Sequence, residues 1–239
     1  MLALFSTSAV AFRAPPSSLR MSATLGQAES TTIYKDRRGQ LDELDTTAML
    51  AAQQFPLSPD ECIAQAKQFI QSGYGKGDAS LLAESFEMVA PVVGPLSRES
   101  YLAAMGGNMD PADGFPDLSG RQFGFHCDPV EPGRVWWVSR PTGTFTQPFF
   151  GAEPTGETIE TPPQSLGVVL DADGKVTKFN MGYSMDRTQG NTGGLGGFFA
   201  FLWFVGKPLP IPECRPYKMS WKFRLINKIG ALAQRLQKP

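Results

Sequence analysis

Residues 165–186 read SLGVVLDADGKVTKFNMGYSMD, and this stretch decides the fold. Two runs of alternating apolar residues flank the short turn sequence ADG, which ends at Gly174. Because an Asp-Gly pair readily adopts the backbone conformation of a tight turn, this pattern is a strong signal of a β-hairpin. We therefore predict two antiparallel strands joined at this turn.

The same alternation extends upstream to about residue 115. In RQFGFHCD it places the two Phe and Cys127 on one strand face, and His126 with Asp128 on the other. Further strands are predicted at RVWWVSR (134–140), TGTFTQPFF (142–150) and PTGETIE (154–160). The second half of the chain is therefore expected to form four to six antiparallel strands.

The first half shows helical spacing instead. Ser58 and Glu61 have the separation of a capping box, and Pro59 suits the first helical position. The apolar residues that follow share one helix face: Cys62, Ile63, Ala66, Phe69 and Ile70.

Two shorter helices are predicted at DASLLAESF (78–86) and RESYLAAMGG (98–107), the second capped by Ser97. Three helices followed by antiparallel strands define an α+β domain. We expect the sheet to curl around the helices and to leave a pocket between them.

The composition is that of a neutral globular protein, with 41% hydrophobic residues, 19% charged residues and a net charge of −1. This charge excludes the basic surface that nucleic-acid binding needs. Cys62, Cys127 and Cys214 lie far apart, no CxxC pair occurs, and His126 is the only histidine. Since a structural zinc site needs four closely spaced ligands, we expect no metal and no disulfide framework, but three buried or free thiols.

The first 21 residues have the composition of a targeting segment. The apolar run MLALFSTSAVAF is too short to span a bilayer, which takes about 20 residues. The basic, Ser-rich segment RAPPSSLRMSA follows it. The junction AVAFRAP, with Ala11 before Phe12, resembles the bipartite targeting signal of algae with secondary plastids. The resemblance implies a plastid protein, in the stroma or associated with thylakoids. The alternative is a frayed terminus without targeting value.

The order of elements and four phrases resemble the nuclear-transport-factor-2-like superfamily, and within it the SnoaL-like polyketide cyclases and the ketosteroid isomerases. The phrases are GDASLLAESF (77–86), FPDL (115–118), TGTFTQPFFGAEPTGETIE (142–160) and DADGKVTKFNMGYSMD (171–186). The resemblance implies a cystatin-like fold: a cone-shaped, curved antiparallel sheet wrapped on three N-terminal helices. It also implies an apolar pocket and, often, a homodimer through the outer sheet face.

The family's catalytic residues are largely missing from this chain. Phe69 stands where the isomerases carry an oxyanion-donating Tyr, and Gly94 stands where they carry the basic Asp. Enolisation needs both groups, so isomerase activity of this kind is not expected. Phe145 replaces a His that the cyclases often carry, and Asp186 is the nearest match to their acid/base residue.

Three polar residues are therefore the candidates for catalysis: Asp186 as acid/base, with Tyr183 and His126 assisting. The alternatives are structural, because His126 with Asp128 would steady a strand end, and Asp186 would pair with Arg187 or cap a turn. The candidate ligand-binding residues are apolar and mostly aromatic: Phe69, Phe125, Trp136, Phe145, Phe179 and Met181.

The last part of the chain begins with GNTGGLGGFFAFLWFVGKPLP, residues 190–210. It matches no phosphate-binding loop, and its apolar run is too short to cross a bilayer. We predict that it closes one end of the cone or docks outside the sheet, with membrane contact as the alternative. From Trp221 a basic amphipathic helix is predicted, suited to an anionic membrane surface or an acidic partner, or else docked on the domain.

These observations support two functional hypotheses. The first is a plastid pocket protein that binds a small apolar ligand (a pigment, isoprenoid or polyketide-like ring) without a cofactor. Whether it also has weak isomerase- or cyclase-type acid/base activity stays open. The second is a non-catalytic accessory protein that docks on the thylakoid membrane or on a photosynthetic complex. The predicted organisation is a targeting segment at 1–21, a linker at 22–57 with a short helix at 41–52, the SnoaL-like domain at 58–190, and the glycine–aromatic segment with the basic helix at 191–239.

Overall fold

The computed structural model describes residues 43–106 and 110–236, with side chains up to residue 229. The predicted targeting segment and most of the predicted linker lie outside the described residues. All elements named below belong to the unit Asp45–Pro239.

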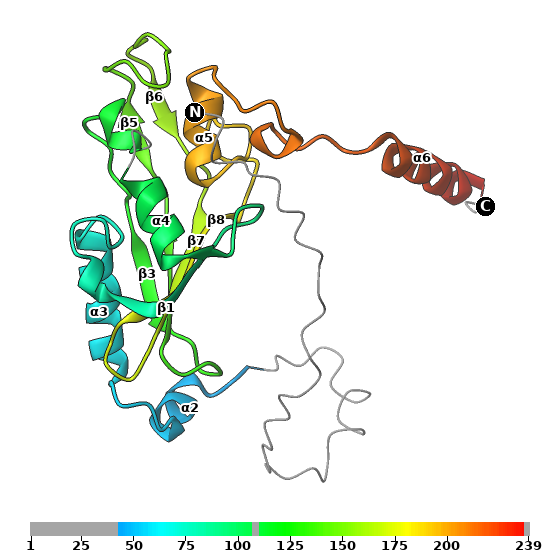
Figure 1. Cartoon of the computed structure of the whole chain (residues 1–239). Helices are drawn as coiled ribbons and strands as arrows, with labels where there is room; N and C mark the ends of the chain where they lie inside the picture. The colour runs from blue at the N-terminus through cyan, green and yellow to red at the C-terminus, as the bar shows by residue number, and fades with distance from the viewer. Residues whose placement is uncertain (1–42, 107–109, 237–239) are drawn as a thin grey trace. The chain divides into compact units, whose positions relative to one another are not determined.

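A curved six-stranded sheet forms the centre of this unit (Figure 1). Its strand order is β2-β1-β8-β7-β4-β3. Neighbouring strands are antiparallel except β1 and β8, which are parallel. The strands are β1 (Leu82–Val89), β2 (Leu96–Ser97), β3 (Phe123–Cys127), β4 (Arg134–Ser139), β7 (Gln164–Leu170) and β8 (Val176–Ser184). A second, two-stranded sheet pairs β5 (Thr142–Thr144) with β6 (Thr158–Glu160).

The predicted hairpin is confirmed as β7 and β8, in which Val168 lies opposite Phe179. At its turn the Asp171 carboxylate accepts hydrogen bonds from the backbone N–H groups of Asp173 and Lys175, at 3.0 and 2.9 Å. Gly174 has φ +78°, a left-handed conformation that glycine adopts without steric strain because it has no Cβ. The turn chemistry therefore sets the register of two central strands.

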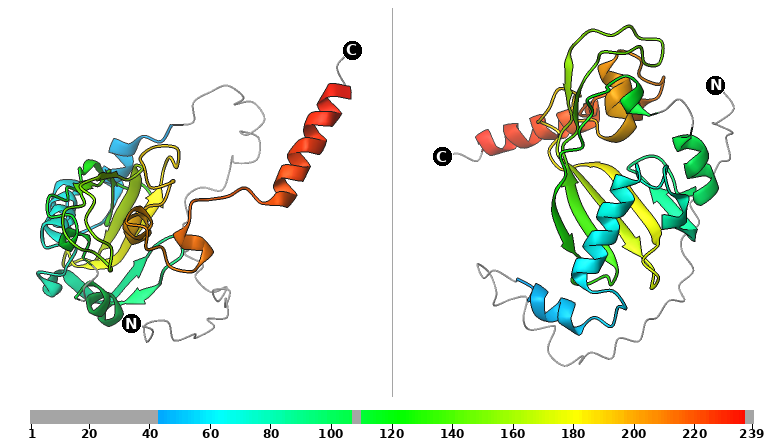
Figure 2. Two further views of the ribbon diagram at one scale, coloured as in Figure 1. Left: turned by 90° about the horizontal axis from the view of Figure 1, so that it is seen from above. Right: turned by 90° about the vertical axis from the view of Figure 1, so that its left-hand side faces the viewer.

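Helix α3 (Pro59–Gln71) begins with the predicted capping box, because Ser58 Oγ accepts from the Glu61 N–H while Glu61 accepts from the Ser58 N–H. It packs on β3 and β4 through its buried face and lies across the strands (Figure 2, right). A short helix, α2 (Thr46–Ala52), precedes it and is capped by Asp45. Helix α4 (Arg98–Met105) is capped by Ser97, as predicted, and packs on β1 and β2.

The helix predicted at 78–86 is wrong. Asp78 caps only the single 3₁₀ turn η1 (Ala79–Leu81), and the chain then runs into β1. The register of β1 against β8 shifts between Leu82 and Glu87, so Leu82 and Phe86 are buried four residues apart within a strand. That irregularity imitates helical spacing in the sequence. With this element reassigned, the α+β class is confirmed, and one of the inter-strand pairings is parallel.

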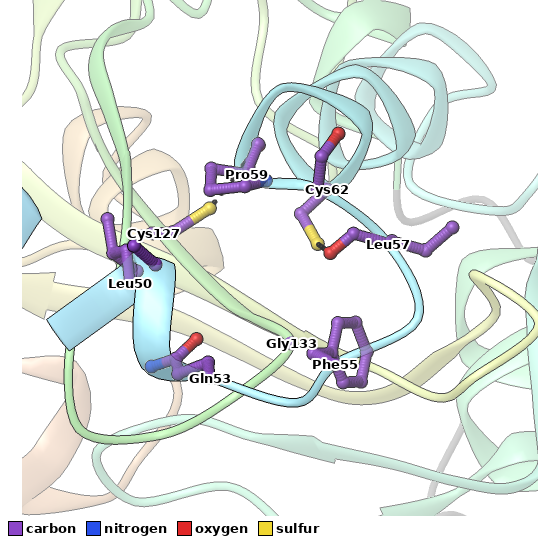
Figure 3. Close-up of a pocket in the computed structure, with 10 residues that line it drawn as sticks. Leu50, Gln53, Phe55, Leu57, Pro59, Cys62, Cys127 and Gly133 are labelled. Atoms are coloured by element: carbon purple, nitrogen blue, oxygen red, sulfur yellow. Dashed lines mark hydrogen bonds between the residues drawn. The ribbon is translucent and has the colours of Figure 1, made fainter. Parts of the chain in front are cut away.

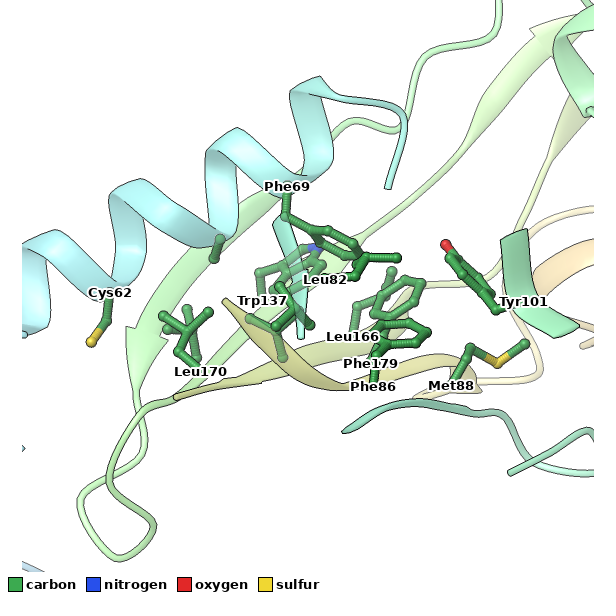
Figure 4. Close-up of a cluster of buried hydrophobic side chains, with 14 of the residues drawn as sticks. Cys62, Phe69, Leu82, Phe86, Met88, Tyr101, Trp137, Leu166, Leu170 and Phe179 are labelled. Carbon is green, nitrogen blue, oxygen red and sulfur yellow. The ribbon is translucent and has the colours of Figure 1, made fainter. Parts of the chain in front are cut away.

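Two hydrophobic clusters hold the described unit together. The larger lies between the sheet and helices α3 and α4, and it includes Phe69, Phe86, Tyr101, Trp137 and Phe179 (Figure 4). The smaller gathers Phe115, Phe145, Phe149, Ala152 and Ile159 with Phe201 of helix α5 (Gly197–Phe204).

The glycine–aromatic segment therefore supplies part of the second cluster. Phe201 is buried there, and Phe198, Phe204 and Val205 pack against the cluster while staying partly exposed. Two further 3₁₀ turns are η2 (Pro111–Asp113) and η3 (Pro212–Cys214), and helix α6 spans Trp221–Leu236. No helix in the described ranges is both long and apolar enough to cross a membrane.

Candidate functional site

A pocket of about 240 Å³ lies where α2 and the start of α3 meet the end of β3 and the start of β4 (Figure 3). Its walls come from segments far apart in the sequence. None of the lining side chains carries a charge at neutral pH: Leu50, Ala51, Gln53, Phe55, Leu57, Ser58, Pro59, Cys62, Cys127 and Gly133. We refer to this as the α2–α3 pocket.

Backbone carbonyls and side-chain donors hold the walls of the α2–α3 pocket in place. Gln53 Nε2 donates to the Asp128 carbonyl at 3.0 Å, which ties the end of α2 to the β3–β4 loop. Cys127 Sγ donates to the Pro59 carbonyl at 3.4 Å, and Cys62 Sγ lies 3.9 Å from the Leu57 carbonyl. Both sulfur contacts link the first turn of α3 to its surroundings (Figure 3).

Gly133 allows the close approach of one wall. It has φ +76°, and a Cβ at this position would lie 2.7 Å from both the Leu170 carbonyl oxygen and the Phe55 ring. Any larger residue would therefore push Phe55 away and strain the backbone. The glycine thus decides how near the Phe55 ring comes to the sheet.

The two thiols of the pocket are neutral. Burial, together with the neighbouring Cys127 thiol, raises the pKa of Cys62 to about 11, and burial raises the pKa of Cys127. Since the thiolate is the nucleophile and the metal ligand, protonated thiols act here as an apolar wall. Within the described residues, no group of three His, Cys, Asp or Glu side chains could hold a metal ion.

Four of the six predicted ligand-binding residues belong to the larger hydrophobic cluster or pack against it: Phe69, Phe125, Phe179 and Met181. Their side chains contact other side chains of that cluster. The Phe69 and Phe179 ring centroids are 5.0 Å apart, and Trp137 stacks on Phe125 at 5.7 Å. Met181 packs against the same cluster. Aromatic pairs at these separations touch. The space between the stacked and edge-on rings is therefore filled, as Figure 4 shows for Phe69, Trp137 and Phe179. A ligand-binding role for these four residues stays a prediction.

The other two predicted ligand-binding residues lie elsewhere. Trp136 points to the opposite sheet face from Trp137, and its Nε1 donates to Asp128 Oδ2 at 2.8 Å. Phe145 belongs to the second cluster, stacked on Phe115 at 5.3 Å. Neither residue is therefore part of one binding surface with Phe69 and Phe179.

The three candidate catalytic residues are not brought together. His126 is on edge strand β3 and Tyr183 is on β8, with β4 and β7 between them. Three strand spacings separate their backbones by roughly 14 Å. The His126 side chain is exposed, and its Nδ1 lies 2.9 Å from the Gly124 carbonyl. Asp128, its predicted partner, instead bonds to Trp136 and to the backbone N–H groups of Val130 and Glu131.

Asp186 caps a turn, which is one of the structural alternatives for this residue. Its carboxylate accepts from Thr188 Oγ1 at 2.6 Å, from the Thr188 N–H at 2.9 Å and from Gln189 Nε2 at 2.8 Å. These bonds, that of the Thr188 hydroxyl above all, lower the pKa of Asp186 to about 2. A carboxylate that is ionised at neutral pH has no proton to donate to a substrate.

Sequence reasoning missed the residues of the α2–α3 pocket and a set of polar groups inside the core. Tyr74 has φ +61°, and its hydroxyl accepts from Gln122 Nε2 at 2.8 Å, while Tyr101 donates to the Tyr74 carbonyl at 2.8 Å. Trp137 Nε1 and Gln122 Oε1 are buried with no hydrogen-bond partner among the described residues. Only the three-glycine stretch around Tyr74 could have marked the segment as special.

A second hollow is an open groove of about 620 Å³ beside β6 and α5. Its lining combines an acid, two polar residues and two aromatic residues: Glu157, Thr158, Asn191, Trp203 and Phe204. Asn191 is committed to the β6 backbone, because its side chain accepts from the Glu160 N–H and donates to the Thr158 carbonyl, both at 2.8 Å. Asn191 therefore has fewer free hydrogen-bonding groups to offer a ligand than the composition of the groove suggests.

No family model matches this sequence, and no curated protein sequence matches it either. Solved structures do match. A Jannaschia sp. CCS1 protein named as a SnoaL-like polyketide cyclase is 18% identical, with 52% of this chain and 85% of that chain covered and a TM-score of 0.40. IdmH from Streptomyces antibioticus, named as a polyketide cyclase, is 19% identical over 52% of this chain and 91% of its own, with a TM-score of 0.40.

A third matching structure is a Mycobacterium tuberculosis protein in complex with estradiol-17beta-hemisuccinate, 13% identical, covering 53% of this chain and 95% of that chain, with a TM-score of 0.37. SnoaL-like polyketide cyclases, the class that the sequence resembles, are thus among the structures that this chain is similar to. The strand order and the helices described above carry the fold assignment.

Proposed function

We propose that this protein binds a small apolar molecule in the α2–α3 pocket, without a cofactor. The observation that carries the proposal is a pocket lining without a single charged residue, in which two thiols are kept protonated by burial. Binding sites for small molecules are concave and mostly apolar, with few polar groups. The α2–α3 pocket is concave and its lining side chains are uncharged and mostly apolar, although polar atoms make up the larger part of the surface that it exposes.

The pocket volume narrows the ligand class. About 240 Å³ is below the roughly 300–1,000 Å³ typical of sites for drug-sized ligands. This size favours a short isoprenoid or a single polyketide-like ring over an extended pigment. Gln53 is the polar side chain that can orient one oxygen of such a molecule, because its Nε2 has a second hydrogen beside the one donated to the Asp128 carbonyl, whereas the Ser58 hydroxyl already donates to Glu61.

The positions of the candidate catalytic residues favour ligand binding without catalysis. The three candidate catalytic residues are dispersed, and Asp186 is held as a carboxylate by its own turn. Acid/base catalysis requires a group within hydrogen-bond reach of the reacting atom, at a suitable pKa. The α2–α3 pocket contains no such group, which supports a carrier or storage role.

The test compares two substitutions on the same helix. Ala51 lines the pocket and Ala52 does not, and both are exposed, so Ala51→Trp fills the space while Ala52→Trp is the matched control. Purified wild-type protein and both variants are extracted with organic solvent, and the extracts are compared by mass spectrometry. We expect one small apolar compound with the wild type and Ala52→Trp, strongly depleted with Ala51→Trp. Equal amounts from all three proteins, or none from the wild type, would contradict the proposal.

We also propose that the protein acts in a plastid, on the strength of the sequence before residue 22. A fusion of residues 1–57 to a fluorescent protein, expressed in an alga with a secondary plastid, is expected to accumulate in the plastid. Phe12→Ala is expected to stop import, because the aromatic residue follows the predicted cleavage point. A cytosolic signal from the unaltered fusion would overturn this part of the proposal.

A further inference from the structure

Helix α6 presents an apolar row that nothing in the described part of the chain covers. Trp221, Leu225 and Ile229 are spaced four residues apart, and their side chains are 68%, 50% and 58% exposed. Ile226, 62% exposed, lies beside them on the same side of the helix. A contiguous exposed apolar surface of this kind marks an interaction site.

The charges around this row all have one sign. Between Lys218 and the C-terminus the chain has no Asp or Glu, and it has six basic residues: Lys218, Lys222, Arg224, Lys228, Arg235 and Lys238. Arg224 and Lys228 are one turn apart and fall outside the apolar row. Lys222 lies next to Trp221, with Nζ 5.9 Å from the ring centroid, and its long side chain can extend past the apolar row to a polar boundary.

The segment before α6 is attached to the domain. The Arg187 guanidinium carbon lies 4.4 Å from the centroid of the Tyr217 ring, and Pro216 packs against Gly193. Helix α6 then begins after Ser220, whose Oγ accepts from the Phe223 N–H at 3.2 Å. The helix therefore starts within a few residues of a fixed point on the domain surface.

We propose that α6 binds the surface of an anionic lipid bilayer. Its 16 residues measure about 24 Å, so it is too short to span the hydrocarbon core, which needs about 20 residues. The charged residues of α6 are all cationic, and Phe223, 48% exposed, lies apart from the apolar row among the polar residues. A helix with an apolar side and a cationic polar side lies in the plane of the interface. Trp221, Leu225, Ile226 and Ile229 enter the boundary between headgroups and acyl chains, while Arg224 and Lys228 face the lipid phosphates.

Charge complementarity selects an anionic bilayer over a neutral one. Each Lys or Arg near an anionic surface strengthens binding roughly fivefold, and Lys222, Arg224 and Lys228 lie on the part of α6 whose side chains are described. Aromatic residues such as Trp221 favour the headgroup level of a membrane. An apolar groove on a protein would accept the same row but would not require that every charged residue around it be basic.

The experiment is flotation of the full-length chain with extruded vesicles. We expect binding to vesicles of phosphatidylglycerol mixed with phosphatidylcholine, weaker by at least about tenfold with phosphatidylcholine alone, and weaker as salt is raised. Ile229→Asp places a charge in the apolar row and is expected to abolish flotation. Asn227→Asp adds the same charge outside the row and is expected to reduce binding only several-fold.

Both variants alter exposed positions, so thermal unfolding of the domain should be unchanged. Equal binding by the two variants, or no binding of the wild type to the anionic vesicles, would overturn the proposal. A dimer that Ile229→Asp converts to a monomer, without vesicle binding, would assign the apolar row to a second copy of the chain instead. Ala51→Trp should float like the wild type, so failure of the ligand proposal remains distinguishable.

Discussion

The chemistry of single residues in this protein depends on which hydrogen bonds they already make. Asp186 was the leading acid/base candidate, yet its carboxylate is occupied by Thr188 and Gln189. The Cys62 thiol lies in a pocket, but burial keeps it protonated. Both residues have a reactive side chain, and in both the immediate surroundings oppose its use in catalysis.

The Asp186 carboxyl is expected to titrate near pH 2, below its usual value of 3.8. Since the folded pKa is lowered, its stabilising effect is present above pH 3.8 and is lost as the pH falls toward 2. Thr188→Ala removes the largest cause and should move the midpoint upward, as measured by NMR of the carboxyl carbon. An unchanged midpoint in Thr188→Ala would refute this assignment of the cause.

Cys62 should make the folded state less stable at alkaline pH. Its pKa rises from 9.0 to about 11 on folding, so between these values the unfolded chain loses the proton first. The stabilising contribution of the protonated Cys62 thiol is fully present below pH 9. The free energy of unfolding therefore falls as the pH rises from about 9 to 11. Urea unfolding at several pH values should show a shallower decline in Cys62→Ala than in the wild type.

Among the elements, local sequence signals predict the starts of the helices better than they predict the strands. Helices α3 and α4 begin at the serines that the sequence marks, Ser58 and Ser97. The sequence of strand β1 predicts a helix, wrongly, because the register shift between Leu82 and Glu87 gives two of its buried residues, Leu82 and Phe86, a spacing of four. Strand β3 carries a similar irregularity at Gly124, which has φ +70°, and Phe123 is consequently exposed.

Removal of the α3 cap should be measurable in a single variant. Ser58→Ala deletes the oxygen that accepts from the Glu61 N–H, and it is expected to lower the free energy of unfolding by about 1 kcal/mol. Gln68→Ala, exposed on the same helix, serves as the control and should change stability by less than about 0.5 kcal/mol. Denaturant unfolding compares them, and equal values would mean that the cap adds nothing.

At the scale of the whole molecule, one ring connects the helices to the sheet. Phe179 of β8 contacts Phe69 of α3 at 5.0 Å, Tyr101 of α4 at 6.4 Å and Trp137 of β4 at 6.5 Å between ring centroids. It also stacks on Tyr74 at 5.4 Å. The larger hydrophobic cluster is therefore organised around a residue of the predicted hairpin (Figure 4).

Phe179→Ala is expected to cost roughly 3–5 kcal/mol of unfolding free energy, because it removes a fully buried ring and leaves a cavity. Phe123→Ala makes the same chemical change at a side chain that is 52% exposed, so it should cost under about 1 kcal/mol. Thermal and denaturant unfolding of both variants check this. Similar losses would show that Phe179 does not hold the helices on the sheet.

The sequence was sufficient for features that depend on neighbours along the chain. The Asp171–Gly174 turn, the capping box at Ser58 and the alternation that separates Trp136 from Trp137 all follow from short-range geometry. These signals were enough to predict an α+β domain and its central hairpin.

Contacts between distant segments required the folded chain. The parallel pairing of β1 with β8, the place of Phe145 in a second cluster and the walls of the α2–α3 pocket join residues that are remote in sequence. Such contacts form because the apolar faces of sheet and helices must be covered, and many arrangements of the same pattern satisfy that need locally. Packing in three dimensions selects one arrangement, and that selection separated His126 from Tyr183 and brought Cys62 beside Cys127.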